Sequence, residues 1–236
     1  LDIPFIGIFG ACSTFVEGLG VGSIFIDSGA ANNIICGASS HFCSAEKQFR
    51  FPLELGNQRP QSSQWTVTGA GSAILSSNGT GPFITHFTPG KIIAMGIKDG
   101  NNMGAAMAPA ALDTLITHLT DTGRKPSYYD AIITGDLGHV GKDILIELAQ
   151  TKGYNIKSNY NDCGVLIFDK ETQDTHSGGS GCACCGTVFS GYLFNMLQTK
   201  KYKKILLIAT GALMNATSSQ QGESIPGIAH AISIEV

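Results

Sequence analysis

Short apolar runs alternate with longer stretches of small and aliphatic residues along most of the chain. Runs typical of buried strands lie at residues 3–9, 32–38, 65–76, 82–88, 91–97, 130–134, 204–210 and 228–236. Stretches that favour helices lie at residues 15–31, 44–50, 103–120, 136–152 and 182–197. The alternation of the two kinds predicts an α/β protein with a mostly parallel sheet, to which antiparallel pairs can be added.

The first twenty residues predict a strand, a sharp turn and a helix. Residues 10–14 form the turn, and small residues flank Cys12 at its tip. A helix N-terminus stabilises a thiolate, so this placement predicts a pKa for Cys12 below the usual value for a cysteine. Two interpretations remain open from spacing alone: a nucleophile presented on an elbow, or a small buried residue at a strand–helix junction.

Strand, helix and strand over residues 3–38 predict a βαβ unit with parallel pairing. Residues 1–98 and 99–236 each contain helices and strands that end in paired strands, which indicates two similar halves with no usable sequence identity between them.

Composition narrows the class of partner. Hydrophobic residues make up 43% of the 236 residues, charged residues only 14%, and the net charge is −3. The chain therefore has no polybasic surface for nucleic acid or anionic lipid. We expect neither a membrane span nor a signal peptide, because no apolar run reaches about 20 residues and no basic stretch leads the first one. An odd count of seven cysteines in apolar surroundings predicts free thiols in a reducing compartment.

Two apparent motifs carry no cofactor. Gly69 and Gly71 lie inside a strand pattern with no helix after them, so they do not form a dinucleotide loop. Cys182, Cys184 and Cys185 have no partner pair at a zinc-ribbon spacing, so we interpret them as small buried residues on a helix and predict no metal. No cofactor is expected.

Three histidines are candidates for a Cys–His site. His139 lies at a helix start after a strand, His176 opens a glycine-rich loop, and His230 lies in the last strand. Two of them beside Cys12 would supply a base or an oxyanion donor.

Five motifs together resemble the thiolase and ketoacyl-synthase superfamily, and within it the stage V sporulation proteins of spore-forming Firmicutes. They are residues 7–14 (GIFGACST), 36–41 (CGASSH), 64–75, 134–138 (TGDLG) and 176–182 (HSGGSGC). The resemblance covers essentially the whole chain. It implies a layered α-β-α-β-α fold of two similar halves, with the first strands and helices of the first half absent from this sequence.

The resemblance places Cys12 at the nucleophile position and His176 at a His or Asn position of the second half. The other catalytic position departs from the enzymes, because ketoacyl synthases have a histidine where this chain has residues 134–138. The loop at 211–227 also lacks the second catalytic cysteine of thiolases. We therefore expect the pocket mainly to bind a ligand rather than to catalyse a condensation reaction.

The resemblance further implies a ligand, dipicolinic acid, as a free dianion or a calcium chelate, during its movement into and out of spores. Residues expected to contact it are Cys12, Asp136, His139, His176, Ser177 and His230. The resemblance also implies a position on the cytoplasmic side of the forespore, peripheral to the inner membrane and beside other proteins of a membrane complex. A homodimer would form near residues 65–76, since the superfamily often pairs through an edge strand.

Two alternatives stay open. The first is an acyltransferase with Cys12 as acyl carrier and His176 as base or oxyanion donor. The second is a non-catalytic scaffold of the spore membrane complex with a vestigial pocket.

Overall fold

The computed structural model of the protein describes residues 2–50 and 59–236. Its larger sheet has the strand order β4-β9-β8-β5-β6. The strands are β4 (Phe83–Thr88), β5 (Ala131–Thr134), β6 (Tyr160–Asp162), β8 (Lys204–Ala212) and β9 (Gly227–Glu235). β5 pairs in parallel with β6 and β8, whereas β9 runs antiparallel to both β8 and β4. The predicted α/β class is confirmed, but the prediction of a mostly parallel sheet is wrong, because the long strand β9 pairs antiparallel with both of its neighbours.

Two smaller pairings complete the strands of the described residues. β1 (Asn33–Ser40) pairs antiparallel with β3 (Gly69–Ser76) over eight residues each. β2 (Trp65–Thr66) pairs in parallel with β7 (Gly179–Ser180), which ties the loop before residue 182 to the segment before β3.

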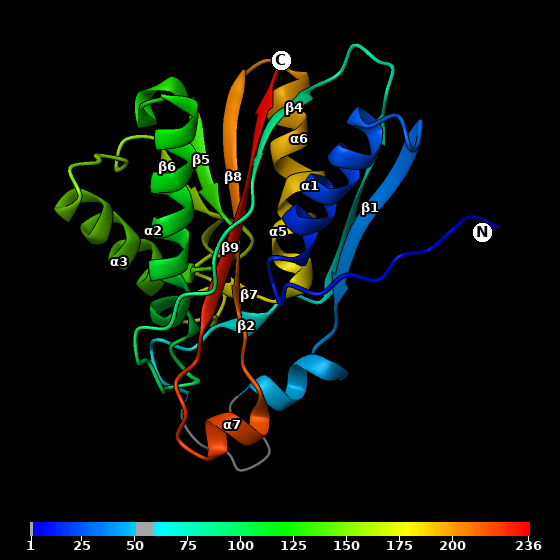
Figure 1. The fold of residues 1–236 in the computed structure, drawn as a ribbon. Helices are drawn as coiled ribbons and strands as arrows, with labels where there is room; N and C mark the ends of the chain where they lie inside the picture. The colour runs from blue at the N-terminus through cyan, green and yellow to red at the C-terminus, as the bar shows by residue number, and fades with distance from the viewer. Residues whose placement is uncertain (1, 51–58) are drawn as a thin grey trace.

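Helices cover both faces of the larger sheet (Figure 1). α2 (Met103–Thr122) and α3 (Gly138–Thr151) pack on one face. α1 (Thr14–Asp27) and the run formed by α5 (Cys182–Val188), a π-helical turn (Phe189–Leu193) and α6 (Phe194–Gln198) lie between that sheet and β1–β3. The described residues thus form four layers, α-β-α-β. Short elements connect them: η1 (Ala45–Phe49), η3 (Pro126–Tyr128), α4 (Cys163–Leu166) and α7 (Ala216–Gln220).

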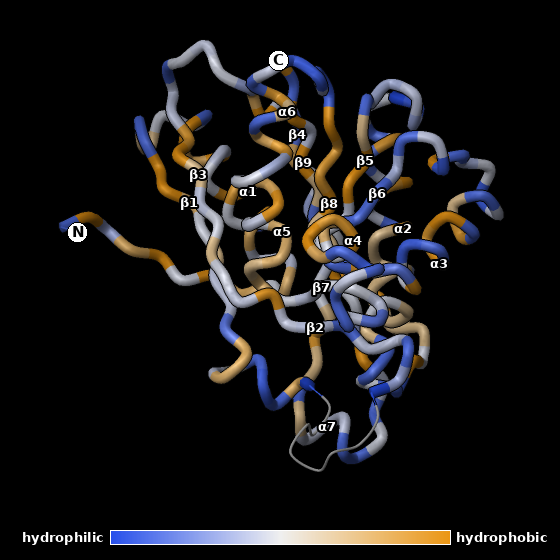
Figure 2. The backbone as a smooth tube through the Cα atoms, turned by 180° about the vertical axis from the view of Figure 1, so that it is seen from behind, coloured by the Kyte–Doolittle hydropathy of each residue, from blue (hydrophilic) through white to orange (hydrophobic). Residues whose placement is uncertain are grey.

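The apolar core has two parts, one on each face of the larger sheet. Ile205 and Leu207 of β8 face the helices between the sheets, while Leu206 and Ile208 face α2 and α3. A strand buried on both faces is apolar at every position, and β8 therefore appears as a continuous apolar run along the interior (Figure 2). No described helix combines the length and hydrophobicity needed to cross a membrane.

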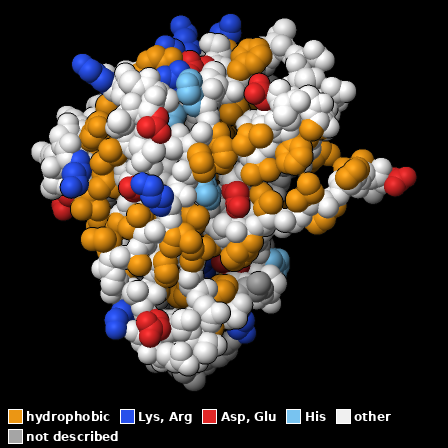
Figure 3. All heavy atoms as spheres, viewed as in Figure 1, with side chains coloured by type: hydrophobic (Ala, Val, Ile, Leu, Met, Phe, Trp, Pro, Cys, Tyr) orange, Lys and Arg blue, Asp and Glu red, His pale blue; other side chains and the backbone are white. Residues whose placement is uncertain are grey.

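The predicted strand at residues 3–9 is wrong. These residues are extended but pair with no strand of the described chain, and Phe5 is 91% exposed. The segment carries apolar side chains away from the body of the molecule (Figure 3). An apolar run becomes a strand only when a neighbour satisfies its backbone hydrogen bonds. The predicted parallel βαβ unit is therefore also wrong, because β1 pairs antiparallel with β3 instead.

Most other predicted elements are confirmed, with local differences. Residues 65–76 form two strands rather than one, and residues 91–97 form only an isolated bridge from Ile93 to Gly227. The expected loop at 211–227 contains α7, and β6 and α4 were not predicted. These missed elements are three to five residues long, too short for periodicity to indicate them.

Candidate functional site

Cys12 lies on a tight turn at the start of α1, as the sequence predicts. Ala11 has a positive φ of 51°, which folds the chain sharply before the helix. The turn is closed by two side chains: the Ser13 hydroxyl donates to the Gly10 carbonyl at 2.5 Å, and the Gly10 amide donates to Thr14 Oγ1 at 3.0 Å. This turn leaves the half-buried Cys12 thiol facing the end of another helix, α5.

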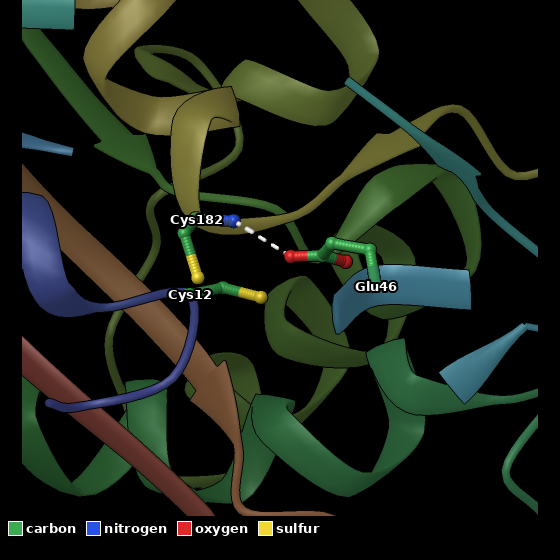
Figure 4. Close-up of side chains that lie close together, drawn as sticks. All are labelled: Cys12, Glu46 and Cys182. Carbon is green, nitrogen blue, oxygen red and sulfur yellow. Dashed lines mark hydrogen bonds between the residues drawn. The ribbon is translucent and has the colours of Figure 1, made fainter. Parts of the chain in front are cut away.

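A second cysteine and a carboxylate meet Cys12 there. Cys182 is the first residue of α5, and its thiol donates to the Ala11 carbonyl at 3.3 Å. Glu46 of η1 accepts a hydrogen bond from the Cys182 amide through Oε1 at 3.4 Å. Figure 4 shows the three side chains pointing toward one another, and their ligand atoms all lie within 4.8 Å of one another.

Asp136 lies beneath Cys12, in the turn between β5 and α3. Its carboxylate is fully buried and accepts hydrogen bonds from Thr210 Oγ1 (2.7 Å), Ser180 Oγ (2.8 Å) and the Gly181 amide (3.1 Å). Burial raises the pKa of Asp136, while these bonds and a further one with Cys12 oppose the rise. Asp136 thus ties the Cys12 turn to β8 and to the start of α5.

The pKa of Cys12 is raised well above its usual value, contrary to the prediction. The largest cause is the hydrogen bond with Cys182, followed by burial and the negative charge of Asp136. Cys182 and Glu46 add smaller contributions in the same direction. These neighbours outweigh the helix N-terminus, whose effect on a charge is modest. At neutral pH Cys12 is a thiol rather than a thiolate.

His176 lies in the loop before β7 with both ring nitrogens engaged. Nδ1 lies 2.9 Å from the Pro60 carbonyl and 3.4 Å from Ser63 Oγ, and Nε2 lies 3.0 Å from Asp174 Oδ1. Its neighbour Ser177 is buried, and its hydroxyl accepts the Val140 amide at 3.2 Å. His176 therefore holds the loop against the segment around residue 60, Ser177 holds it against α3, and none of these hydrogen bonds is to Cys12.

His139 and His230 make their contacts elsewhere. His139 opens α3, where burial first and then Lys170 and Lys142 lower its pKa. His230 of β9 accepts the Gly90 amide through Nδ1 at 3.1 Å, and its ring lies against Phe87. Of the six predicted contact residues, the structure brings Asp136 to Cys12, sets His176 and Ser177 in the loop before β7, and places His139 at the start of α3 and His230 in β9.

A narrow cleft opens beside this group, and the sequence analysis did not predict it. The residues that line it include two arginines, three aromatic side chains and several polar groups: Phe42, Phe49, Arg50, Arg59, Ser63, Gln64, Trp65, Thr66, Gly100, Asn101 and Met103. The Arg59 guanidinium lies 4.8 Å from the centre of the Trp65 ring, and Phe42 stacks on Trp65 at 5.9 Å with an interplanar angle of 6°.

Hydrogen bonds hold both arginines of the cleft in place. Arg50 donates to Thr66 Oγ1 at 2.7 Å and pairs with Glu46 at 3.0 Å. Arg59 pairs with Asp174 at 2.8 Å, and Asp174 also contacts His176. Glu46 thus contacts both Arg50 of the cleft and Cys182. Asp174 likewise contacts both Arg59 of the cleft and His176. The one available signal was the single tryptophan of the chain close to two arginines.

Comparison with known proteins indicates one family. The profile of the family described as Stage V sporulation protein AD matches residues 1–235. The Stage V sporulation protein AD of Bacillus subtilis (strain 168) is 43% identical over 235 residues, which cover 100% of this chain and 69% of that protein.

Solved structures with a similar fold are condensing enzymes. The 3-oxoacyl-[acyl-carrier-protein] synthase III of Aquifex aeolicus VF5 matches with a TM-score of 0.57 at 16% identity, over 97% of this chain and 66% of that one. The corresponding enzyme from Pseudomonas aeruginosa PAO1 matches with a TM-score of 0.59 at 11% identity, again over 97% and 66%. The chain thus has the thiolase-like fold and spans about two thirds of the length of these enzymes. At such identities the likeness concerns the fold alone.

Proposed function

The chain belongs to the Stage V sporulation protein AD family, and we propose that its cleft binds dipicolinic acid and supports the uptake of this acid into spores and its release from them. The proposal places the protein on the cytoplasmic side of the forespore, peripheral to the inner membrane and beside other proteins of a spore membrane complex. The pairing of two arginines with stacked aromatic rings in one cleft carries the proposal.

Dipicolinate is a planar aromatic ring with two carboxylates, and the cleft offers a partner for each part. Arg50 and Arg59 bring two guanidinium groups to one cleft, and a guanidinium binds a carboxylate through two parallel hydrogen bonds. Phe42 and Trp65 stack on each other at the cleft, and the aromatic ring of the ligand would extend this stack. A dianion that leaves water needs such partners, because an unpaired buried charge is costly.

The charges around Cys12 favour the cleft over the cysteine turn as the binding position. Asp136 and Glu46 are carboxylates, and a dianion placed beside Cys12 would face both. In the cleft, Glu46 is paired with Arg50 and Asp174 with Arg59. His176 acts on the ligand indirectly: it holds Asp174, the partner of Arg59, and the segment from Pro60 to Ser63 in place.

Acyl transfer is the weaker alternative. An acyl carrier needs a thiolate at the moment of attack, yet Cys182 and Asp136 hold the Cys12 thiol protonated. His176, the base in that alternative, has both nitrogens occupied by Pro60 and Asp174. A scaffold role needs no ligand, and a binding measurement separates it from the proposal.

Isothermal calorimetry of dipicolinate tests the proposal, with the emission of Trp65 as a second readout. We expect saturable binding that perturbs the emission of this single tryptophan and is weakened about tenfold or more in Arg59→Met, since a charge-assisted pair is worth about 1.5–3 kcal/mol. His176→Ala should weaken binding less. Lys91→Met is the matched control and should bind as the unaltered protein does, because Lys91 is exposed and pairs with Asp113 at 3.9 Å.

Added calcium distinguishes the two forms of the ligand. Binding that falls as calcium removes the free dianion supports the arginine pairing, whereas binding that requires calcium supports the chelate. Absence of heat and of any change in emission contradicts the proposal. Acylation of Cys12 by an acyl thioester, detected by mass spectrometry, would support the acyltransferase alternative instead of the binding proposal.

A further inference from the structure

We propose that Cys12, Cys182 and Glu46 form a binding site for a thiophilic divalent cation, with Zn²⁺ as the ion that fits them best. This site is separate from the proposed dipicolinate cleft and does not depend on it. Its fourth position would be taken by water or by a group entering from the cleft side.

The ligand atoms are close enough for such a site. Zinc binds thiolate sulfur at about 2.3 Å and carboxylate oxygen at about 2.0–2.2 Å in tetrahedral geometry, which sets two sulfurs about 3.8 Å apart. The two sulfurs and a carboxylate oxygen lie within 4.8 Å of one another. Figure 4 shows that the three side chains come together from three separate segments, with the Cys12 sulfur directed toward Glu46. Small side-chain rotations would therefore bring all three onto one ion.

The site is built on well-packed elements. Cys12 precedes α1 and Cys182 opens α5, and these helices pack against each other in the layer between the sheets. Glu46 is oriented by two hydrogen bonds, one from the Cys182 amide at 3.4 Å and one from Arg50 at 3.0 Å. Outer partners that fix a ligating carboxylate in this way raise metal affinity.

The local charge also favours a cation. Asp136 and Glu46 both place negative charge near the Cys12 sulfur, and Arg50 supplies the positive charge that faces it from the cleft side. A divalent ion would compensate this excess and displace the thiol protons, as thiolate ligation requires.

Two sulfur ligands decide which cations are suitable. Calcium and magnesium take oxygen ligands, whereas thiolates select zinc and other soft ions. The site is therefore not the place for a calcium ion that accompanies dipicolinate. Cys184 and Cys185 do not belong to this cluster: both are buried in the apolar core, and Cys185 contacts Cys163.

The fold supplies the partner that the sequence spacing lacks. Cys182 has no cysteine pair at a zinc-ribbon distance, but the contact between α1 and α5 brings Cys12 to it. The proposal therefore departs from the expectation of no metal, and of the cysteines at 182–185 only Cys182 takes part.

The test is a titration of the full chain with Co²⁺ in the presence of a phosphine reductant. Cobalt in a tetrahedral thiolate site gives a sulfur-to-metal charge-transfer band in the near ultraviolet and d–d bands in the visible. We expect one equivalent to produce both, Zn²⁺ to abolish them, and Cys12→Ser or Cys182→Ser to remove the charge-transfer intensity in part. The double variant should remove it entirely, and Glu46→Gln should weaken binding about tenfold or more.

Cys43→Ser is the matched control, because Cys43 is an exposed free thiol outside the site. Circular dichroism shows whether each variant is folded, and Cys12→Ala replaces Cys12→Ser if the hydroxyl disturbs the turn. Bands that persist in the double variant, or that depend on Cys43, overturn the proposal. So does the absence of a charge-transfer band in the unaltered protein, or a Cys12–Cys182 disulfide that survives the reductant.

Discussion

Glu46 Oε2 lies 3.0 Å from the Arg50 guanidinium, and this ion pair joins the cysteine cluster to the cleft. The side chains of both residues are largely shielded from water, with 13% and 8% exposure. The pair is therefore less screened by salt than an exposed ion pair. A substitution at one residue changes the electrostatic environment of the other. The Glu46 and Arg50 side chains thus connect the proposed cation site to the proposed dipicolinate site.

Arg50→Met should therefore affect both sites, while Arg59→Met should affect one. Loss of Arg50 removes a partner of dipicolinate and also frees Glu46 to rotate, so we expect weaker dipicolinate binding and a changed cobalt spectrum. Arg59 pairs with Asp174 instead, so its loss should leave the cobalt spectrum intact. Parallel calorimetry and absorption titrations of the two variants make the comparison. Identical behaviour of both variants in both titrations would contradict the link through Glu46.

Cys12 should react slowly with alkylating reagents near neutral pH. Its raised pKa leaves little thiolate, and thiolate is the reactive form. We expect iodoacetamide at pH 8 to label the exposed Cys43 well before Cys12, as followed by mass spectrometry of the digested protein. Asp136→Asn removes one negative charge beside the sulfur, so Cys12 in that variant should become reactive at lower pH. If Cys12 were the fastest thiol in the unaltered protein, the raised pKa would be wrong.

The contact between α2 and α3 should not tolerate a methyl group at Gly104. A Cβ there would meet the Leu137 carbonyl and would lie 2.9 Å from the Gly141 amide nitrogen, both of which are backbone atoms. We expect Gly104→Ala to lower the free energy of unfolding by about 1–3 kcal/mol, as overpacking does. Urea denaturation measures it.

Gly191 is the matched control for that substitution. It is exposed, lies in the π-helical turn, and a Cβ on it would meet no atom within 4 Å. Gly191→Ala should leave stability unchanged or raise it by up to about 1 kcal/mol, because alanine favours helix over glycine. Equal losses in the two variants would show that the α2–α3 contact is not the cause.

His118 should make the protein less stable in mild acid. The ring is fully buried between Thr88 Oγ1 at 2.8 Å and the Tyr129 hydroxyl at 2.6 Å. Burial, with smaller contributions from His86 and Arg124, lowers its pKa to about 4. In the unfolded chain the pKa is about 6.5, so the unfolded state binds the proton more readily, and stability falls as pH drops through this window.

Denaturation between pH 7 and pH 4 measures that loss, and an NMR titration of the ring gives the pKa directly. His118→Gln lacks the titrating group and should show a flatter dependence over the same range. A ring that titrates near pH 6.5 in the folded protein would contradict the prediction.

The sequence was informative where structure depends on local pattern. The helical spacing at residues 103–120 and 136–152 predicted α2 and α3, and the apolar runs at 130–134 and 204–210 predicted β5 and β8. The run at residues 3–9 is also apolar, like the runs that form β5 and β8, but it has no neighbouring strand among the described residues. Periodicity reports which side chains can be buried and contains no information about the partner of a strand.

The candidate site was predicted less well, because it depends on contacts between distant segments. The turn at Cys12 is local and was predicted, whereas its pKa is set by Cys182 and Asp136, which lie far along the chain. The cleft residues Arg50, Arg59 and Trp65 lie at the end of one predicted element, in the polar stretch after it and at the start of the next element, so no single pattern groups them. Only the folded chain shows that Glu46 contacts Cys182 and that Arg59 lies over Trp65.

The antiparallel pairing of β4 with β9 has a consequence for the order of folding. Among the described residues β4 is an edge strand and pairs with β9, nearly 150 residues later, as the hydrogen bond from Thr85 to Glu235 illustrates. During synthesis, β4 leaves the ribosome long before its partner exists. Its backbone groups stay unpaired until β9 emerges and pairs with β8. Closing so long a loop is slow, so completion of this edge should be the last step of folding and the one most exposed to mispairing.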